Sequence, residues 1–360
     1  MENKIKIGYL IGSSEIGGTE KMILTIAKHL DKNIFQIVFF CIKGKGKFTE
    51  KIKQEGFKVY VFNFKKNPFS FITLFLYLKK EKLDILQTFL FVGNIIGRIY
   101  GRILRIKVIS SQRSTEPWRK WYHWFLEKIT KNFASLIISN SYSAKEILVR
   151  KGRIKRNKIK VIPNGIEIPE KIERNIVKKD VVIVGTVGNL RKAKGHIYLI
   201  KSAKVVVEKF KNIRFYIVGE GELKNVIFDT IKKEKLQDYF ILTGFVENVS
   251  EYLKIFDIFV LPSLWEGCPV SLLEAMGYEL PCIATDVGDI PYIIENGKDG
   301  FIFKKGDYKK MAEIIIRLIE DENLRKEIGQ KARRKIKKYY SFEKMVNLYA
   351  SIYRVCKSKK

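Results

Sequence analysis

The sequence predicts an α/β protein made of two doubly wound domains, each a parallel sheet with helices on both faces. Short apolar runs alternate with amphipathic, helix-like segments, which is typical of strand–helix–strand units. A polar, charged stretch at 167–180, which we interpret as an interdomain linker, interrupts this alternation before it starts again. The chain has 360 residues, too many for one ordinary domain and suitable for two of roughly 150–200.

In the first half of the chain, the residue pattern predicts strands and helices in strict alternation. The strand segments are short apolar runs rich in β-branched and aromatic residues, and the helix segments place apolar residues at helical spacing. The predicted strands are 4–11, 35–42, 59–62, 85–88, 107–110, 136–140 and 159–162. The predicted helices are 19–30, 48–55, 68–82, 93–104, 118–133 and 143–151.

The second half repeats this architecture without repeating the sequence. Its predicted strands are 181–187, 213–218, 240–243, 258–262, 282–285 and 300–303. Its predicted helices are 195–209, 221–234, 249–255, 270–278, 290–294, 308–321, 323–339 and 342–357. We therefore expect two Rossmann-like domains, 1–168 and 169–340, with a last helix at 341–360 packing back on the first domain. Such domains would face each other across a cleft, with a ligand where the carboxyl ends of their strands meet.

Composition narrows the class of protein. The hydrophobic content of 46% is enough for packed cores, and the net charge of +31 predicts attraction to an anionic partner. The other interpretation, that the lysines only cover solvated helix surfaces, stays open. The four cysteines, Cys41, Cys268, Cys282 and Cys356, form no C-x-x-C pair, so we expect a reducing compartment and no zinc site. We expect no signal peptide, and the longest apolar run, 69–78, is too short to span a bilayer.

The most informative segment is 261–291, LPSLWEGCPVSLLEAMGYELPCIATDVGDIP. Glu266 lies in a Gly/Pro-rich turn after a strand, and Glu274 follows eight residues later in an apolar helical run. An acid-bearing loop between strand and helix is how α/β proteins build nucleotide sites, and two carboxylates suit the two ends of a hydroxylated ligand. The alternative is that Glu274 is a surface charge and Glu266 stabilises a helix N-terminus. The apolar surroundings of Glu274 favour a functional role.

Three glycine-containing loops follow other strands. The loop 188–195 offers Arg191 and Lys194 to a phosphate. The loop 12–20, GSSEIGGTE, permits close approach to a ligand, although Thr19 and Glu20 also suit a helix cap. Gly219 and Gly244 would line the same rim as Glu266, or form plain turns. None of these segments has dinucleotide-fingerprint or P-loop spacing.

In combination these motifs resemble a known family. The segment EGCPVSLLEAMGYELPCIATDVGDIPYII resembles the donor-site signature of retaining nucleotide-sugar glycosyltransferases of the GT-B fold, family 4 (glycosyl transferases group 1). GGTE, VIPNGIE, VGNLRKAKGH, IVGEGEL and LTGFVENVSEYLKIFDIFVLPS extend the resemblance over nearly the whole chain. It is closer in the C-terminal half than in the N-terminal half.

The resemblance implies roles for individual residues. Glu274 would hold the donor ribose, Glu266 the donor-sugar hydroxyls, and Lys194 the diphosphate charge. Arg191 would supply the charge of an arginine that the family often has in place of Asn189. The donor-binding set would be completed by Gly17, Gly18, Gly188, Asn189, Gly219, Gly267, Cys268, Pro269, Val270 and Ser271. Glu20 would be an acceptor-side residue.

One departure from the family pattern concerns the N-terminal domain. Many members have a His after a strand there, aimed at the reacting sugar, whereas this chain has Gln87 at one such place and Arg113 near the other. Arg113 is therefore a candidate for contacting the donor, and Glu116 for positioning the acceptor. His29 and His123 suit structural or surface roles, and His196 a helix cap. The chain has no D-x-D pair, so we expect metal-independent transfer with no cofactor besides a UDP- or GDP-linked sugar.

These observations favour a hexosyltransferase acting on a cell-surface glycan, a lipid-linked or a lipopolysaccharide-type acceptor, in the cytoplasm or peripherally on the inner face of the cytoplasmic membrane. Segments 64–82 and 118–131 mix aromatic and basic residues, which suits an anionic membrane surface. We favour core packing for the first and an interface for the second. The alternatives are a non-catalytic nucleotide-sugar-binding relative, a sugar epimerase on the same fold, or a nucleic-acid binder. The dispersed charge and the lack of a nucleic-acid module argue against the last.

Overall fold

The computed structural model describes residues 4–113, 116, 118–172 and 181–358. The chain divides into two compact units, an N-terminal unit of Met1–Asn164 with Phe342–Lys360 and a C-terminal unit of Gly165–Ser341. These divisions lie within a few residues of the predicted boundaries at 168 and 340. Part of the predicted linker, 173–180, lies outside the described residues.

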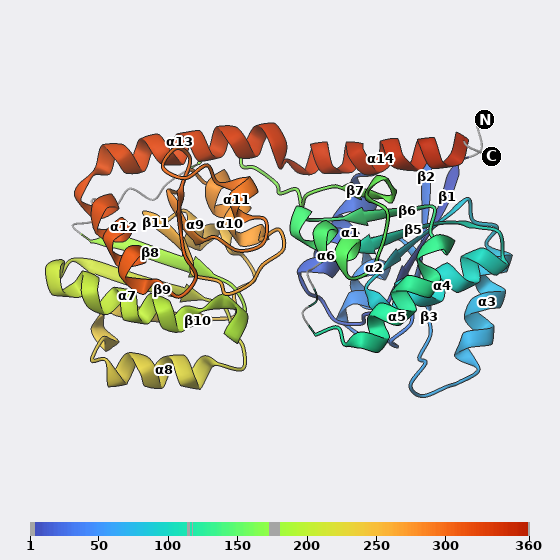
Figure 1. Ribbon diagram of the computed structural model, residues 1–360, viewed down its shortest axis with the longest axis horizontal. Helices are drawn as coiled ribbons and strands as arrows, with labels where there is room; N and C mark the ends of the chain where they lie inside the picture. The colour runs from blue at the N-terminus through green and yellow to red at the C-terminus, as the bar shows by residue number, and fades with distance from the viewer. Residues whose placement is uncertain (1–3, 114–115, 117, 173–180, 359–360) are drawn as a thin grey trace. The chain divides into compact units, whose positions relative to one another are not determined.

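The N-terminal unit is a parallel seven-stranded sheet in the order β3-β2-β1-β4-β5-β6-β7 (Figure 1). Its strands are Ile5–Ile11, Phe35–Cys41, Lys58–Val61, Ile85–Phe89, Lys107–Gln112, Leu136–Ser139 and Ile159–Val161, β1 to β7. Its helices are Gly18–His29, Lys47–Gln54, Ser70–Lys80, Phe91–Ile103, Trp121–Thr130 and Tyr142–Arg150, α1 to α6, and Phe342–Ser358, α14. The strand order reverses between β1 and β4, which makes the loops after these strands the expected place for a ligand.

Aromatic packing joins the last helix to this sheet. Helix α14 packs against α1, β1 and β4. The hydroxyls of Tyr353 on α14 and Tyr9 on β1 lie 2.9 Å apart, and the Tyr353 ring lies 6.0 Å from that of Phe35 on β2. Both tyrosines are fully buried, so α14 is part of the core of the N-terminal unit.

Helices α3, α4 and α5 are neighbours on the right-hand side of Figure 1. Helix α4 lies unusually close to the sheet because of two glycines. A Cβ on Gly97 would come within 2.2 Å of the Thr88 side chain, and one on Gly101 within 2.1 Å of Val108. Larger residues at these positions would push α4 away from β4 and β5.

A buried ionic network links α5 to α4 and to strand β5. Arg98 of α4 donates to Glu127 of α5 at 2.5 Å and to Ser110 of β5 at 2.9 Å. Arg119 donates to the other oxygen of Glu127 at 3.1 Å. The side chains of Arg98, Arg119 and Glu127 are each 1% exposed. Removing one partner of such a network would leave an uncompensated buried charge, which typically costs about 3–5 kcal/mol.

The C-terminal unit is a parallel six-stranded sheet in the order β10-β9-β8-β11-β12-β13. Its strands are Val182–Val187, Ile213–Val218, Phe240–Gly244, Ile258–Leu261, Cys282–Thr285 and Phe301–Phe303, β8 to β13. Its helices are His196–Lys209, Lys224–Lys233, Ser250–Leu253, Val270–Gly277, Ile290–Ile293, Tyr308–Glu320 and Glu322–Tyr339, α7 to α13. The strand order reverses between β8 and β11.

The predicted doubly wound fold is confirmed, with differences in detail. The helix predicted at 118–133 begins only at Trp121, because the Lys120 N–H donates to His123 Nδ1 at 3.0 Å and caps the helix there. The core prediction for 64–82 is half wrong, since α3 buries Leu74 and Leu78 but exposes Ile72 and Leu76. No helix among the described residues combines the length and the apolarity that a membrane span requires.

Candidate active site

Two side chains from neighbouring loops meet where the strand order of the C-terminal sheet reverses. Lys194 lies in the loop after β8 and Glu266 in the loop after β11, and Lys194 Nζ is 2.6 Å from Glu266 Oε1. Their side chains are 22% and 12% exposed, so the pair is open to solvent on one side. In α/β proteins, ligands bind beyond the carboxyl ends of the strands, at the place where the strand order reverses. A lysine and a glutamate at this place suit a ligand that has both charged groups and hydroxyls.

A chain of hydrogen bonds holds Glu266 in place. Ser263 Oγ donates to Glu266 Oε1 at 2.7 Å, and Thr285 Oγ1 at the end of β12 donates to the Ser263 carbonyl at 2.6 Å. Ser263 and Thr285 are completely buried. Because Lys194 and Ser263 both bind Oε1, the carboxylate is oriented by one oxygen. Sequence reasoning missed Ser263 and Thr285, and their only signal was a polar residue at or just beyond the end of an apolar strand.

The loop that carries Glu266 leads into the first turn of α10. Pro269 is the N-cap residue with extended backbone, and the helix starts at Val270. The N–H groups of Val270 and Ser271 have no acceptor within the helix, because the first turn of any α-helix leaves its donors unpaired. They and the helix dipole favour an anion at this end. Cys268 is 6% exposed and packs in the core beneath the loop.

A glycine on the following segment supports the Glu266 loop from below. Gly288 has φ +61°, and a Cβ there would lie 2.4 Å from the Glu266 carbonyl oxygen. The next residue, Asp289, donates its N–H to the Gly267 carbonyl at 3.0 Å. The segment 286–291, DVGDIP, thus packs against the backbone of the Glu266 loop. Only glycine fits at position 288 without displacing that backbone.

Glu274 lies on α10 one turn beyond its start and is half-buried. Its neighbours Leu273, Ala275 and Met276 are fully buried in the core of the C-terminal unit. Its carboxylate therefore lies on the side of α10 that does not enter the core. The role of Glu274 in holding a ribose stays a prediction.

Glycines bring the neighbouring loops together at the same edge of the sheet. Gly219, with φ +143°, would place a Cβ 2.1 Å from the Gly188 carbonyl oxygen, and its N–H donates to the Gly244 carbonyl at 3.0 Å. Gly195 has φ +64° and would place a Cβ 2.0 Å from the Pro262 carbonyl oxygen. These approaches fix the loop of Lys194 against the loop of Glu266.

Two predicted residues of the Lys194 loop lie apart from the pair. Asn189 and Arg191 are exposed, and Arg191 lines a cavity of about 240 Å³ together with Lys192, Tyr198 and Leu264. Of the predicted cations of this loop, Lys194 alone contacts the Glu266 carboxylate among the described residues.

His196 differs from its predicted role. The N-cap of α7 is Gly195, and His196 is the first helical residue, 3% exposed. Burial, and secondarily the charge of Lys194, lowers the pKa of His196 to about 4. The imidazole is therefore neutral at physiological pH, and its Nδ1 has no hydrogen-bond partner among the described residues.

The predicted residues of the N-terminal unit have partners within that unit. The exposed Gly17 and Gly18 start α1, and Glu20 Oε2 accepts the Gly17 N–H at 3.1 Å. Glu20 is 7% exposed and caps the helix, which is the alternative that the sequence left open. This contact gives its predicted acceptor-side role no support.

Arg113 and Glu116 are also buried. The Arg113 guanidinium donates to Asn164 at 2.8 Å and to Tyr349 at 3.4 Å. Glu116, with φ +47°, forms an ion pair with Arg119. Each side chain thus has a structural partner, and the predicted contacts with the donor and the acceptor remain predictions without support from these contacts.

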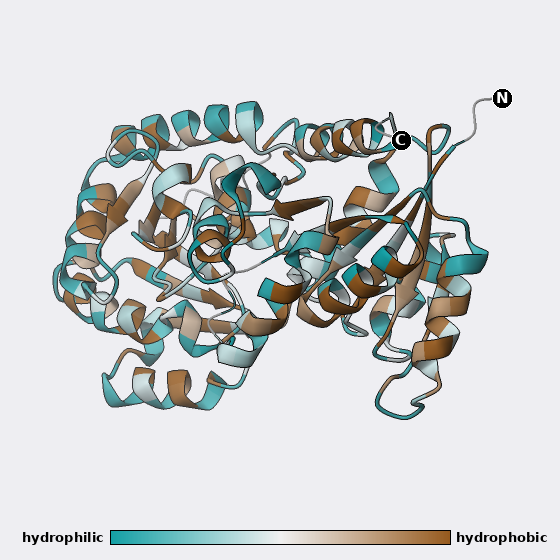
Figure 2. Ribbon diagram, turned by 45° about the vertical axis from the view of Figure 1, so that its right-hand side comes forward, coloured by the Kyte–Doolittle hydropathy of each residue, from teal (hydrophilic) through white to brown (hydrophobic). Residues whose placement is uncertain are grey.

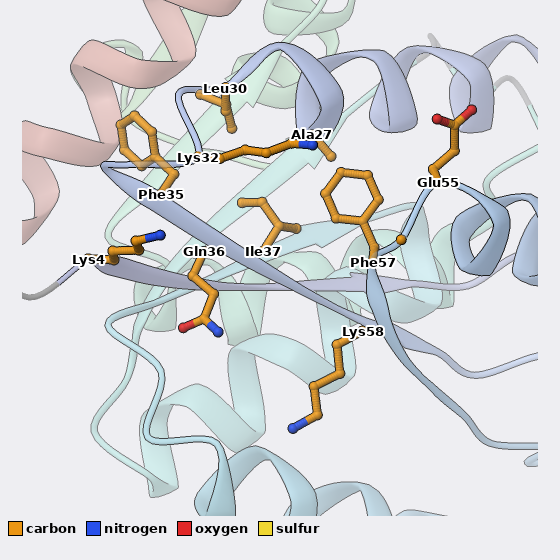
Figure 3. Close-up of a pocket in the computed structure, with 11 residues that line it drawn as sticks. Lys4, Ala27, Leu30, Lys32, Phe35, Gln36, Ile37, Glu55, Phe57 and Lys58 are labelled. Carbon is orange, nitrogen blue, oxygen red and sulfur yellow. The ribbon is translucent and has the colours of Figure 1, made fainter.

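A cavity at the other end of the N-terminal sheet has a different character. It measures about 350 Å³ and is lined by Phe35, Ile37 and Phe57 together with lysines such as Lys58 (Figure 3). Phe35 and Lys58 begin β2 and β3, and Phe57 directly precedes β3, so the cavity lies at the amino ends of these strands, opposite to where α/β sheets bind ligands. Lys58 is paired with Glu81 at 2.7 Å. We assign no function to this cavity.

Comparisons with known proteins match both halves of the chain. Residues 16–169 match the family Glycosyltransferase Family 4, and residues 167–335 match Glycosyl transferases group 1. The capsular polysaccharide biosynthesis glycosyltransferase CapM of Staphylococcus aureus is 31% identical over 72% of this chain and 73% of its own length. The chain belongs to glycosyltransferase family 4. It is a glycosyltransferase enzyme.

Another relative and several solved structures match this chain over nearly its whole length. The UDP-Gal:alpha-D-GlcNAc-diphosphoundecaprenol alpha-1,3-galactosyltransferase of Escherichia coli is 28% identical over 98% of this chain and 97% of its own length. Among solved structures, Anabaena Alr3699/HepE in complex with UDP superimposes with a TM-score of 0.86 at 20% identity, over 96% of this chain and 99% of that one. The lipopolysaccharide outer core galactosyltransferase WaaB superimposes with a TM-score of 0.75 over 96% of this chain and 99% of its own. The family 4 glycosyltransferase therefore has the GT-B fold.

Within the C-terminal unit the structure brings one group of predicted residues together. Lys194 meets Glu266 directly, and the donor-binding candidates on the same loop and helix start adjoin them: Gly267, Cys268, Pro269, Val270 and Ser271. Among the described residues, no cluster of three or more His, Cys, Asp or Glu could hold a metal ion. Metal independence of the transfer stays a prediction.

Proposed function

We propose that this glycosyltransferase transfers a hexosyl group, with retention of anomeric configuration, from a UDP-linked sugar to a lipid-linked glycan. The names of its relatives support the substrate classes. The Escherichia coli relative uses UDP-Gal and a diphosphoundecaprenol-linked acceptor, and the Anabaena neighbour binds UDP. Retention rests on the resemblance of the donor-site motifs to those of retaining enzymes.

The Lys194–Glu266 pair carries this proposal. As the bond between the anomeric carbon and the diphosphate oxygen breaks, negative charge accumulates on the diphosphate. Lys194 and the N-terminus of α10 are the positive groups of the site that would stabilise this charge, and both are fixed before the reaction. Glu266, held through Oε1, would present Oε2 to a hydroxyl of the donor sugar.

A ligand panel tests the donor. We expect UDP and a UDP-sugar to raise the melting temperature of the protein, because a ligand at about 100 times its Kd adds about 2.7 kcal/mol to stability. Glu274→Gln should weaken this shift, while Glu208→Gln, a change at an exposed residue of α7, serves as the control. A stronger shift with GDP- or ADP-sugars would contradict the UDP assignment, and no shift with any of them would contradict a nucleotide-sugar site.

Product analysis tests the reaction. Incubation with an α-linked UDP-sugar and a lipid-linked acceptor should give an α-linked product, which NMR coupling constants at the anomeric proton identify. A β-linked product would contradict retention. Donor binding without transfer or donor hydrolysis would instead favour the non-catalytic relative.

We further propose that the enzyme works in the cytoplasm as a peripheral protein on the inner face of the cytoplasmic membrane. A lipid-linked acceptor supports this location, because its reacting sugar lies at the bilayer surface.

A further inference from the structure

Three consecutive helices form a continuous outer layer on one face of the N-terminal sheet. The Tyr100 hydroxyl of α4 donates to the Phe71 carbonyl of α3 at 3.2 Å, and the Tyr100 ring lies 5.5 Å from Phe75. On the other side, Phe91 of α4 lies 5.0 Å from the His123 ring of α5. We call the outward side of α3, α4 and α5 the α3–α5 face.

The α3–α5 face exposes large apolar side chains on each of its helices. In Figure 2 the helices at the lower right carry brown, hydrophobic segments. Six side chains on these helices are more than half exposed: Ile72 61%, Leu76 56%, Ile103 61%, Trp121 79%, Phe125 55% and Ile129 52%. Phe69 (71%) and Trp118 (53%), in the segments before α3 and α5, are also more than half exposed. Monomeric soluble proteins rarely expose so many large apolar groups on one surface unless the surface binds something.

The charge of the same surface has one sign. Nine Lys or Arg residues are exposed within 64–113, 116 and 118–133: Lys65, Lys66, Lys79, Lys80, Lys82, Arg102, Arg105, Lys120 and Lys128. Within these described residues no Asp or Glu is exposed, since Glu81, Glu116 and Glu127 are buried and Asp84 is half-buried. A mixed surface would alternate signs, whereas this one combines apolar anchors with unopposed positive charge.

This charge decides between possible occupants. A second copy of the chain would place the same positive surface against itself, so self-association through this face is disfavoured. An anionic bilayer matches both features of this face. Its negative headgroups attract the lysines, and the region between headgroups and acyl chains accepts the aromatic side chains. We propose that the α3–α5 face is the membrane-binding surface and that it docks onto anionic phospholipid. The proposal deepens, and rests on, the membrane association proposed above.

The structure also shows that the anchors are held on a rigid platform. On α5, Trp121 and Phe125 point outward while Trp124 and Glu127 are buried. Glu127 is fixed by Arg98 and Arg119, and the Arg119 guanidinium stacks 4.9 Å from the Trp124 ring. Surface contacts therefore form on helices that are ordered beforehand, so binding costs little ordering entropy.

Vesicle flotation of the full-length protein tests the proposal. The protein should float with vesicles of equal parts phosphatidylglycerol and phosphatidylcholine at low salt, and much less with phosphatidylcholine alone. The double variant Phe69→Ser/Trp121→Ser should lower the vesicle partition coefficient by about tenfold or more. Lys79→Gln/Lys80→Gln/Lys120→Gln/Lys128→Gln should abolish the preference for phosphatidylglycerol. The matched control is Val226→Ser/Phe228→Ser on α8, whose side chains are 50% and 47% exposed.

The proposal is overturned if the protein stays with neither vesicle at low salt, or if the α3–α5 variants float as well as the control. Light scattering that shows dimers lost in the Phe69→Ser/Trp121→Ser variant, without vesicle binding, would overturn it in favour of a second copy. The thermal shift with UDP separates this test from that of the donor site. Variants that lose flotation but keep the UDP-induced rise in melting temperature are still folded. A protein that floats with vesicles but shows no such rise would contradict the proposed UDP-sugar donor, while the proposed membrane-binding surface would still hold.

Discussion

Replacing Ser263 by Ala removes one hydroxyl from a fully buried position and leaves the rest of the site intact. The lost interaction is the 2.7 Å bond from Ser263 Oγ to Glu266 Oε1. The Thr285 hydroxyl still donates to the backbone carbonyl of residue 263, so the loop keeps its conformation. The perturbation therefore acts on the orientation of one carboxylate.

The expected size follows from the charge of the acceptor. A hydrogen bond to a charged group contributes about 1.5–3 kcal/mol, which would lower kcat/KM by roughly ten- to hundredfold if it were fully expressed in the transition state. Lys194 still binds the same oxygen at 2.6 Å, so Glu266 is not released completely. We expect a decrease near the lower end, about tenfold.

The assay compares two buried serines. Sugar transfer from the UDP-sugar gives kcat/KM, and thermal unfolding gives stability. Ser202→Ala is the matched control, because Ser202 on α7 is equally buried and its hydroxyl has no hydrogen-bond partner among the described residues. Equal activity of the two variants would refute a role of Ser263 in orienting Glu266, as would a loss of Ser263→Ala activity that merely follows its melting temperature.

Three other changes test the site and its surroundings. Lys194→Met should lower kcat by about a hundredfold or more, since it removes a preorganised charge from the leaving group, and unchanged kcat in steady-state transfer would contradict that role. Gly288→Ala should destabilise the protein by about 1–3 kcal/mol in chemical denaturation and reduce activity, because its Cβ meets the Glu266 carbonyl. Gly297→Ala has a similar φ, +79°, with nothing within 4 Å, and should keep its activity. His196 has a folded pKa below its unfolded value of about 6.5, so the unfolded chain binds the extra proton and stability falls as the pH drops from 6.5 to 4, by about 3 kcal/mol. His196→Gln should flatten this part of the stability curve in urea titrations, and an unaltered slope would argue against a neutral buried imidazole.

The order of strands and helices could be read from the sequence because apolar runs and helical spacing repeat along the chain. Element ends were harder where polar residues are buried. Strand β5 continues through Ser111 and Gln112, two residues beyond its predicted end. The Ser111 hydroxyl accepts a bond from Gln87, and Gln112 accepts one from Arg119 at 3.0 Å. A polar residue satisfied inside the fold has the same sequence signal as a loop.

The sequence predicted individual residues of the site but not the contacts between them. Glu266 and Lys194 stand out by residue type and by their place after strands, but 72 residues separate them, and only the sheet order brings them within hydrogen-bond distance. Ser263 shows no pattern that distinguishes it from any serine after a strand. On α3, periodicity shows that one side is apolar enough for a core, yet it cannot show that Ile72 and Leu76 on the other side face outward.

The buried network of Arg98, Glu127 and Arg119 has a consequence for how this enzyme can change over evolutionary time. It sets the rotation of α5 by charges that only a concerted replacement could remove. Substitutions at Trp121 or Phe125 on the outer side therefore do not shift the helix. The buried side of α5 is constrained by this network and the outer side is not, so relatives could change the surface that meets the membrane while the inherited scaffold stays unchanged.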